Sequence, residues 1–528
     1  MTAASRSLAL GARRYPVVLP NIRDPRLHVA AVIISIHVLG QVGLHFRVTI
    51  PQILAAILTC AVIEVVLTFR TSKSFVWPAS AMLTGSGVAL ILRANGTTAG
   101  DPWGTQDVLL FAGVAGFALL TKYVIKYRGS HLFNPSNLGL VVAFLVLGVD
   151  RVQPLDFWWG PLDGWLILAY AIILIGGTLI TRRLHLLVMG ATYWVTLAIG
   201  IGILSASGHC MTADWAFGPV CGVDFWRTIL TSPEVLIFLF FMLTDPKTIP
   251  SGRVARIAFA LSVGILSTLL IAPATIEFWA KVGLLSSLVI VCGLRPVFDR
   301  YLPAAKTEAD RPSWFVGRLT GPAPVGAHAI RTAGRVALAM VVLVTLGGGI
   351  VMAGTPARLT APTGDVIYID AASRVDPASI PAITMDPSVT TWNAERVRQE
   401  APGLALRLAQ NLAVENEAIL AKDKDLLARV DHGDRLKENT AAIDQATQTG
   451  TTALTRYRFD SMFLTVKLLA TQAGLGMAFV SHGTATTERY DASGHLVDRH
   501  DAPFSLMFVI RQVFGDDRWF DVGVIPAP

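Results

Sequence analysis

The chain has 528 residues, of which 53% are hydrophobic and 15% charged, and its mean hydropathy is +0.54. Soluble domains usually carry about 25% charged residues, so this composition excludes a disordered chain, a coiled coil and an ordinary soluble enzyme. It is typical of a polytopic membrane protein with an attached soluble domain. The net charge of +7 does not indicate nucleic-acid binding, because Lys and Arg mark the cytoplasmic side of membrane proteins. Four cysteines without a CxxC pair support neither a disulfide scaffold nor a metal or iron–sulfur site.

Apolar segments long enough to span a bilayer core of roughly 30 Å recur from residue 28 to residue 354. Two of them look short or interrupted: 78–93 contains Thr84-Gly85-Ser86-Gly87, and 134–149 opens with Asn134-Pro135. The eleven predicted spans are 28–46, 51–69, 78–93, 106–121, 134–149, 160–180, 185–205, 229–244, 256–273, 277–294 and 335–354.

Positive charges predict the orientation. The first 27 residues carry five Arg and no long apolar stretch precedes them, so they do not read as a cleavable signal peptide. With the N-terminus inside, the inner segments carry far more Lys and Arg than the outer ones. We therefore expect a multi-pass protein of a bacterial-type inner or plasma membrane, with a cytoplasmic N-terminus.

The predicted domains are a cytoplasmic segment 1–27, a ten-span membrane domain 28–305, a cytoplasmic linker 306–334, an eleventh span 335–354 and an extracytoplasmic domain 355–528. In the last of these, 392–446 has a helical pattern. After Thr451 come short alternating runs at Met462, Gly476, Ser505 and Trp519, which are typical of strands. Helices followed by antiparallel strands predict a soluble α+β domain, with a helical layer on a curved sheet.

The first ten spans divide into two sets of five. An odd number of spans in each set gives the two sets opposite orientations, which is the arithmetic of an inverted repeat. The fold class is therefore an all-α membrane domain, a ten-helix inverted repeat plus one extra transmembrane helix, with the α+β domain after it. In such folds, interrupted helices of both halves meet near mid-depth and expose backbone groups that need a ligand, an ion or a side chain.

Four short motifs occur in a fixed order within 30–305. They are Ala81-Met-Leu-Thr-Gly85, Phe117-Ala-Leu-Leu-Thr-Lys122, Phe133-Asn-Pro-Ser-Asn-Leu-Gly139 and Phe241-Met-Leu-Thr-Asp-Pro-Lys-Thr248. In this order they resemble one family of membrane proteins, which comprises the D-type component of the Rnf electron-transport complex and the B-type component of the sodium-pumping NADH:quinone oxidoreductase. The branch of this family associated with enediyne biosynthesis also fits, since it need not pump ions.

The resemblance implies a ten-span inverted-repeat fold, similar to urea channels, that holds flavin within the membrane and passes electrons. Family members carry FMN covalently on a Thr that follows the helix after Phe-Asn-Pro. The corresponding loop here, Val149 to Trp165, contains neither Thr nor Ser. A covalently linked flavin at that place is therefore excluded, which leaves a non-covalent flavin (riboflavin or FMN) or a fold without a redox role.

The resemblance also implies a flavin site. It carries the non-covalent flavin contact of the family over to Asn134, with His131 at the family's polar position three residues earlier. Asn137 is a second amide on the same helix face. The alternative is that Asn134-Pro135 only caps the helix, with Asn at the N-cap and Pro at the first helical position.

The second predicted break is Thr244-Asp245-Pro246. There Thr244, Asp245 and Lys247 are candidate flavin contacts, and Thr84 lies at the opposing break. An acid or base beside the flavin would tune its potential. The alternative is a helix end enforced by proline, with the Asp at the surface.

Two further features lie outside this site. Glu64 is deep in the second span, where a charge is costly, so it is either a proton or sodium site or a hydrogen-bonded structural acid. Cys210 and Cys221 share an outer loop, where an oxidising exterior permits a disulfide, and two free thiols are the alternative.

The sequence leaves three functions open. The first is an electron-transport subunit with non-covalent flavin, working beside other subunits of a membrane or redox complex. The second is a transporter or channel for a small solute on the same inverted repeat. The third is a membrane scaffold whose exported domain binds a partner. No catalytic residue and no metal ligand is predicted, and whether the chain is an enzyme stays undecided.

Overall fold

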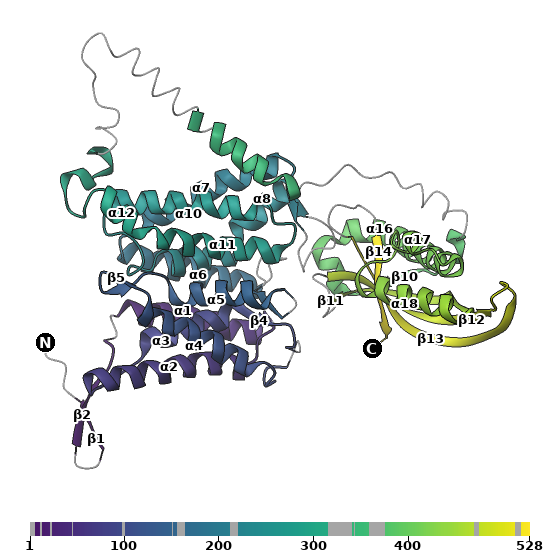
Figure 1. Ribbon diagram of the computed structural model, residues 1–528, viewed down its shortest axis with the longest axis horizontal. Coiled ribbons are helices and arrows are strands. Elements are labelled where there is room, and N and C mark those ends of the chain that lie inside the picture. The colour runs from purple at the N-terminus through teal and green to yellow at the C-terminus, as the bar shows by residue number, and fades with distance from the viewer. Residues whose placement is uncertain are drawn as a thin grey trace, which may run out of the picture. The chain divides into compact units, whose positions relative to one another are not determined.

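The computed structural model of the chain divides into two compact units (Figure 1). The helical unit comprises Met1–His209 and Cys221–Ala357, and the C-terminal unit comprises Arg358–Pro528 together with Cys210–Val220. The structure describes residues 6–10, 13–21, 24–44, 46–97, 101–149, 151–155, 164–211, 220–314, 341–342, 344–357, 375–468, 475–512 and 519–527. Most of the predicted linker 306–334, and residues 335–340 and 343 of the predicted eleventh span, lie outside these described residues.

Five helices form the first half of the helical unit, and their starts follow from local sequence. Asp24 caps the first helix by accepting from the Arg26 N–H. Thr49 and Gln52 form a capping box at the start of the second, and Asn134 caps the fifth, each satisfying backbone donors that the helix leaves free. The helices are α1 (Pro25–Val42), α2 (Ile50–Ser72), α3 (Ala79–Ile91), α4 (Val108–Val124) and α5 (Pro135–Leu147).

The second half contains an irregular helix. Between α7 and α10 the chain forms α8, then α9, which continues directly into the π-helix η1. Short π-helical segments are rare and occur frequently at functional sites. The elements are α6 (Gly164–Arg183), α7 (Leu187–Ala206), α8 (Gly222–Thr231), α9 (Pro233–Ile237), η1 (Phe238–Leu243), α10 (Arg253–Ile271), α11 (Glu277–Gly293) and α12 (Arg295–Tyr301).

Six helical segments of the helical unit are long and apolar enough to cross a membrane, and a seventh is α11 joined to α12 through a bend of 46°. This confirms the expected apolar helical domain. The prediction of eleven spans is met only in part, because the remaining four correspond to shorter apolar helices. These are α3, α4, α5 and Val344–Ala353.

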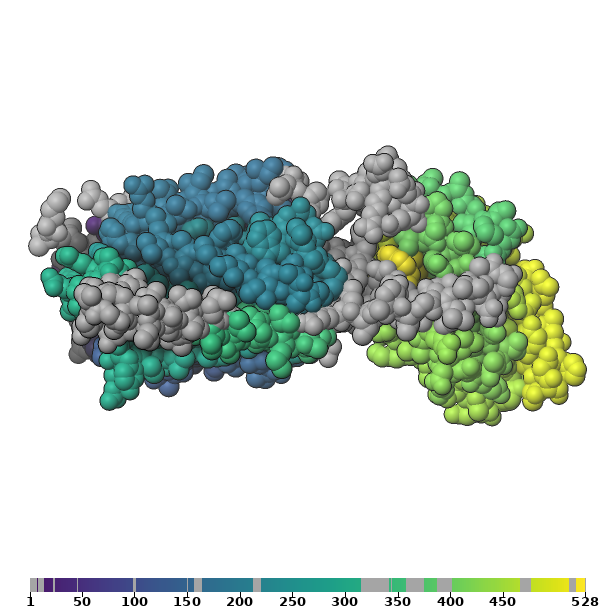
Figure 2. All heavy atoms as spheres, turned by 90° about the horizontal axis from the view of Figure 1, so that it is seen from above, coloured from purple at the N-terminus to yellow at the C-terminus, as the bar shows by residue number. Residues whose placement is uncertain are grey.

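The outer faces of these helices are apolar. Large apolar side chains stand exposed along α2, α6 and α7, among them Leu58 (55% exposed), Ile175 (62%) and Val188 (67%). In the space-filling view, the blue residues of α6 and α7 form a broad side of the helical unit (Figure 2). Water-soluble proteins rarely expose apolar patches of this extent, so the surface fits contact with lipid.

The expected interruption at Thr84-Gly85-Ser86-Gly87 is wrong, because α3 runs through these residues without a break. Their glycines serve close packing instead. A Cβ on Gly85 would lie 2.4 Å from the Ala56 carbonyl oxygen of α2, and one on Gly87 would lie 3.1 Å from the Ser136 Oγ of α5. The third span is thus short because α3 begins and ends early.

Short strands complete the helical unit. The segment expected only as a cytoplasmic N-terminus contains an antiparallel pair, β1 (Arg6–Leu10) and β2 (Arg13–Val18), and β2 continues parallel to β3 (Phe75–Val76). Two two-stranded pairs connect helix ends of this unit: β4 (Leu92–Ala94) with β7 (Val152–Pro154), and β5 (Lys126–Tyr127) with β6 (Ser130–His131). A further pair consists of β8 (Cys210–Met211) and β9 (Val220–Cys221).

The C-terminal unit is a five-stranded sheet with helices packed on it, which confirms the predicted sheet domain. The strands lie in the order β10-β11-β12-β13-β14. Only β10 pairs in parallel among them, with β11. The elements are β10 (Ile383–Met385), α16 (Pro387–Ala421), α17 (Lys424–Leu427), α18 (Gly433–Thr449), β11 (Thr452–Leu468), β12 (Leu475–Tyr490), β13 (Leu496–Gln512) and β14 (Trp519–Pro526).

The core of this unit lies between α16 and the sheet. Leu404, Leu408 and Leu412 are spaced four residues apart, so they share one face of α16, and they are buried against aromatic rings such as Phe479 and Phe508. This amphipathic pattern is why the helix could be predicted from the sequence.

Candidate functional site

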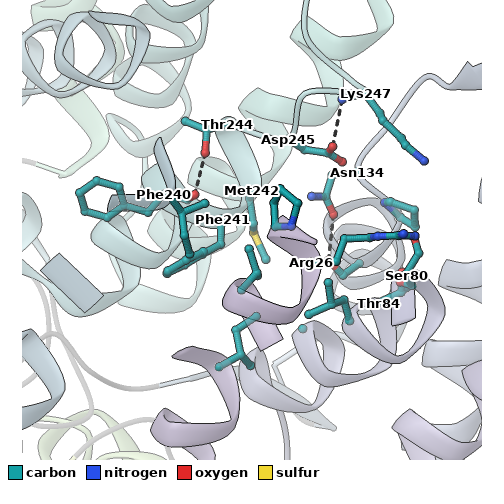
Figure 3. A pocket seen from close by; sticks show the side chains of 18 of the residues that line it. Arg26, Ser80, Thr84, Asn134, Phe240, Phe241, Met242, Thr244, Asp245 and Lys247 are labelled. Carbon is teal, nitrogen blue, oxygen red and sulfur yellow. Dashed lines mark hydrogen bonds between the residues drawn. The ribbon is translucent and has the colours of Figure 1, made fainter. Parts of the chain in front are cut away.

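A cavity of about 330 Å³ lies inside the helical unit (Figure 3). Its walls come from the start of α1, from α3, from the start of α5, from the end of α6 and from the chain around the end of η1. The predicted site residues among its lining are Thr84, His131, Asn134, Thr244, Asp245 and Lys247. Residues separated by more than a hundred positions in the sequence therefore meet in one place.

Asn134 is held in place by its role as a helix cap. Its Oδ1 accepts from the Asn137 N–H (3.3 Å) and from the Ser136 hydroxyl (2.8 Å), and Pro135 occupies the first helical turn. The capping role weighed from the sequence is thus present. Because the cap uses only the oxygen, the Asn134 amide nitrogen can still donate toward the cavity.

The chain after η1 supplies the opposite wall. The Thr244 hydroxyl is buried and donates to the Phe240 carbonyl (2.6 Å). One Asp245 carboxylate oxygen lies 3.3 Å from His131 Nε2, and the other accepts from the Lys247 N–H (3.0 Å). In Figure 3 Thr244, Asp245 and Lys247 stand above Asn134, with Thr84 below it. The cavity wall thus combines an acid, an imidazole and an amide.

Asn137 does not line this cavity. Its amide nitrogen donates to the Leu285 carbonyl (3.0 Å) on α11, and the side chain is buried between α5 and α11. Asn134 and Asn137 are three positions apart, but only Asn134 precedes the helix. The cap turns it toward the cavity, while Asn137 already faces the packed interior.

The start of α1 also contributes to the cavity, which the sequence did not predict. Asp24 and Arg26 also line the cavity, and the Arg26 Nη2 lies 2.5 Å from an Asp24 oxygen. The hydrogen bond from Arg26 lowers the pKa of Asp24. In the sequence, the Asp24-Pro25-Arg26 run predicts the start of a helix, but it does not indicate that these side chains line a cavity.

Glu64 has partners that the sequence did not reveal. Lys122 Nζ lies 3.0 Å from Glu64 Oε2, and the Tyr123 hydroxyl donates to the same carboxylate. Lys122 also donates to the Ser80 hydroxyl (3.4 Å), and Ser80 lines the cavity. This ion pair therefore reaches the cavity wall through a single serine.

Cys210 and Cys221 are both disulfide-bonded, while Cys60 and Cys292 are free thiols. Because the chain has four cysteines, the bond joins Cys210 to Cys221. Cys210 is the first residue of β8, and Cys221 is the last residue of β9, the strand that pairs with it. The other residues predicted for this loop, 212–219, lie outside the described part of the chain.

A second cluster of polar residues lies in the C-terminal unit, where no site was predicted. Carboxylate oxygens of Glu415, Asp431 and Asp521 all lie within 4.8 Å of one another. Arg435 pairs with Glu415 through two hydrogen bonds of 2.9 and 2.7 Å, and the Asn439 amide donates to Asp431 (2.6 Å). Burial, together with the charge of Glu415, raises the pKa of Asp431 to about 10 and that of Asp521 well above its usual value. At neutral pH the cluster therefore holds protons.

No protein-family model matches the chain, and no curated protein matches it.

Proposed function

We propose that the helical unit is a membrane-embedded electron-transport subunit that binds a flavin, riboflavin or FMN, non-covalently in the cavity around Asn134. The observation that carries this proposal is the meeting of Thr84, Asn134 and Asp245 in the lining of one cavity. A cavity of about 330 Å³ falls within the range of small-molecule sites, about 300–1,000 Å³.

The chemistry of the lining suits an isoalloxazine. The ring carries carbonyl acceptors and one N–H donor on its rim, so amides and charged groups can bind that edge. Asn134 offers amide hydrogens and Asp245 a carboxylate, while Phe240 and Phe241 supply apolar surface for the rings. The His131–Asp245 pair stands where its charge would influence the reduction potential of a bound flavin.

We also propose that the helical unit is built from two oppositely oriented halves. Packing in one half has counterparts in the other: α2 packs on α4 as α7 packs on α10, and α4 packs on α5 as α10 packs on α11. Contacts between the halves join corresponding members, α1 with α6 and α5 with α11. This pattern supports an inverted repeat, which places its site where the halves meet.

The colour of the purified full-length protein tests the proposal. A bound flavin absorbs at about 450 nm, so we expect a yellow preparation. Denaturation should release the flavin intact, because residues 149–165 contain no Thr or Ser that could form an ester with it. A well-folded, colourless protein that also takes up no riboflavin or FMN would contradict it.

Variants of Asn134 separate binding from capping. Asn134→Asp keeps the capping oxygen but loses the amide donor, so we expect about tenfold weaker flavin binding, equal to about 1.4 kcal/mol, with an unchanged melting temperature. Asn134→Ala should lose both. The control is Asn95→Ala. The Asn95 side-chain amide donates to the Val149 carbonyl and does not line the cavity. Unchanged flavin content in Asn134→Asp would place the flavin elsewhere.

A transporter or channel for a small polar solute is the second candidate. The charged groups Asp24, Arg26 and Lys247 at the cavity would suit a polar solute as well as a flavin. Solute uptake into vesicles by a colourless protein would favour this function.

A further inference from the structure

A second cavity of the helical unit, of about 920 Å³, has more basic than acidic residues in its lining. It lies where the α6–α7 turn, the start of α10 and the chain after α12 come together. Five basic side chains line it against two acidic ones, Glu308 and Asp310. The basic residues are Arg182, Arg253, Arg256, Lys306 and Arg311.

Among the residues that the structure describes, none of the five cations forms an ion pair within 4.0 Å. Arg256 interacts with Asp310 at longer range and donates to the Pro250 carbonyl (3.0 Å). Asp310 is buried, and its Oδ1 accepts from the Val254 N–H (3.1 Å) at the first turn of α10. Arg253 and Arg256 are three positions apart and so share a helix face. A bound anion would relieve the mutual repulsion of these side chains.

An apolar cavity of about 520 Å³ adjoins the basic one. Leu187 lines both cavities. The apolar cavity extends along α6 from Thr181 to Tyr170 and is otherwise lined by side chains such as Trp194 and Leu239. The eleven helical steps from Tyr170 to Thr181 cover about 16 Å, which matches one leaflet of a bilayer core, about 15 Å. A polar, cationic cavity thus borders an apolar one that is about as long as an acyl chain.

We propose that the two cavities together bind one phospholipid with an anionic head group. The phosphate lies among Arg182, Arg253 and Arg311, and an acyl chain lies along α6 and α7. The ligand class follows from the joined chemistry, because a free phosphate would leave the apolar cavity unused and a neutral lipid would leave the cations unpaired. Basic pockets at the cytoplasmic edge of helices are suited to such head groups. The apolar cavity shares Phe240 with the cavity at Asn134. The basic cavity shares no lining residue with it, so the head-group contacts do not depend on flavin.

The test measures the melting temperature of the purified full-length protein in neutral detergent. Phosphatidylglycerol, phosphatidylcholine with the same chains, and inorganic phosphate are added in parallel. We expect a saturable rise in melting temperature with phosphatidylglycerol and little change with the other two. Arg182→Gln, Arg253→Gln and Arg311→Gln each remove one exposed cation and should each weaken phosphatidylglycerol binding about fivefold.

Two controls keep the outcome clear. Arg300→Gln, an exposed cation on α12 outside the cavity, should leave lipid binding unchanged. The triple change of Arg182, Arg253 and Arg311 to Lys keeps the charge and should retain most of the binding. Equal stabilisation by phosphatidylcholine, equal stabilisation by inorganic phosphate, or wild-type lipid affinity in the Gln variants would each overturn the proposal.

Discussion

The two units treat buried carboxylates differently. In the helical unit, Glu64 pairs with Lys122 at 3.0 Å, and Lys281 lies 3.6 and 3.7 Å from Glu234 and Glu277. In the C-terminal unit, three carboxylates share one cation, Arg435. Asp431 and Asp521 have neutral amides as hydrogen-bond donors instead, from Asn439 and Asn411.

The difference shows two ways of avoiding an isolated buried charge. Desolvating a charge is costly, and the cost is met either by an opposite charge or by taking up a proton. In the helical unit, lysines pair with Glu64, Glu234 and Glu277, so these acids stay compensated at any pH at which both partners are charged. The C-terminal cluster is protonated instead, and its stability therefore depends on pH. Three experiments test this contrast.

The largest effect is expected for Arg435→Leu. Removing the single cation leaves Glu415 buried beside two other acids, and breaking a buried pair in this way costs about 3–5 kcal/mol. The free energy of unfolding of the C-terminal unit, followed in the full chain by denaturant titration with limited proteolysis, should fall by that amount.

The matched control is Lys424→Ala, because its ion pair with Asp444 (2.6 Å) is half exposed on both sides. Such surface pairs contribute less than about 1 kcal/mol. A similar small loss for Arg435→Leu would mean that the cluster needs no cation.

A smaller effect, about 2 kcal/mol, is expected for Lys122→Met in the helical unit, because the pair is only partly buried. The double variant Glu64→Gln/Lys122→Met removes both charges and should regain most of the lost stability. Melting temperatures in detergent measure both. If the double variant is no more stable than Lys122→Met, the lysine does not act by neutralising Glu64.

The third experiment concerns pH. Asp431 has a pKa of about 10 in the folded protein against an ordinary value of 3.8. Between these values the folded state holds a proton that the unfolded state has released, so the contribution of this group to stability falls as pH rises. Asp431→Asn stays neutral and should lose less stability between about pH 5 and about pH 9.

Melting temperatures of the full chain across that range provide the measurement. The variant should gain on the wild type toward high pH and approach it at low pH. Part of the slope should remain, because Asp521 also has a raised pKa. Parallel curves for the two proteins would show that Asp431 is not the group that takes up the proton.

Several features of the fold were predictable because they follow from local pattern. The strands at Met462, Gly476, Ser505 and Trp519 all fall within β11 to β14, since alternation and turn residues are local signals. The sequence also predicted that Asn134 caps a helix and that the proline after it occupies the first helical position. The break expected at Thr84 was wrong, because small residues in a helix serve equally as breaks and as close contacts, and only the neighbour Ala56 decides which.

Contacts between distant segments could not be predicted in the same way. Lys122 ends one of the four sequence motifs, and nothing in the motif indicates that it pairs with Glu64, 58 positions earlier. Nothing in the sequence links Asp431 to Asp521, whose segments are joined by a backbone bridge in the folded unit. Each contact depends on how elements pack, and single-sequence pattern carries no record of that.

The apolar helices, the sheet domain that follows them and the capped starts of individual helices follow from the amino-acid sequence, because hydropathy period and capping act over a few residues. Which polar groups share a cavity, which acids receive a cation and which keep a proton depend on the folded structure. Those outcomes depend on distances between residues far apart in the chain, and electrostatic and hydrogen-bond energies are settled only when those distances are fixed.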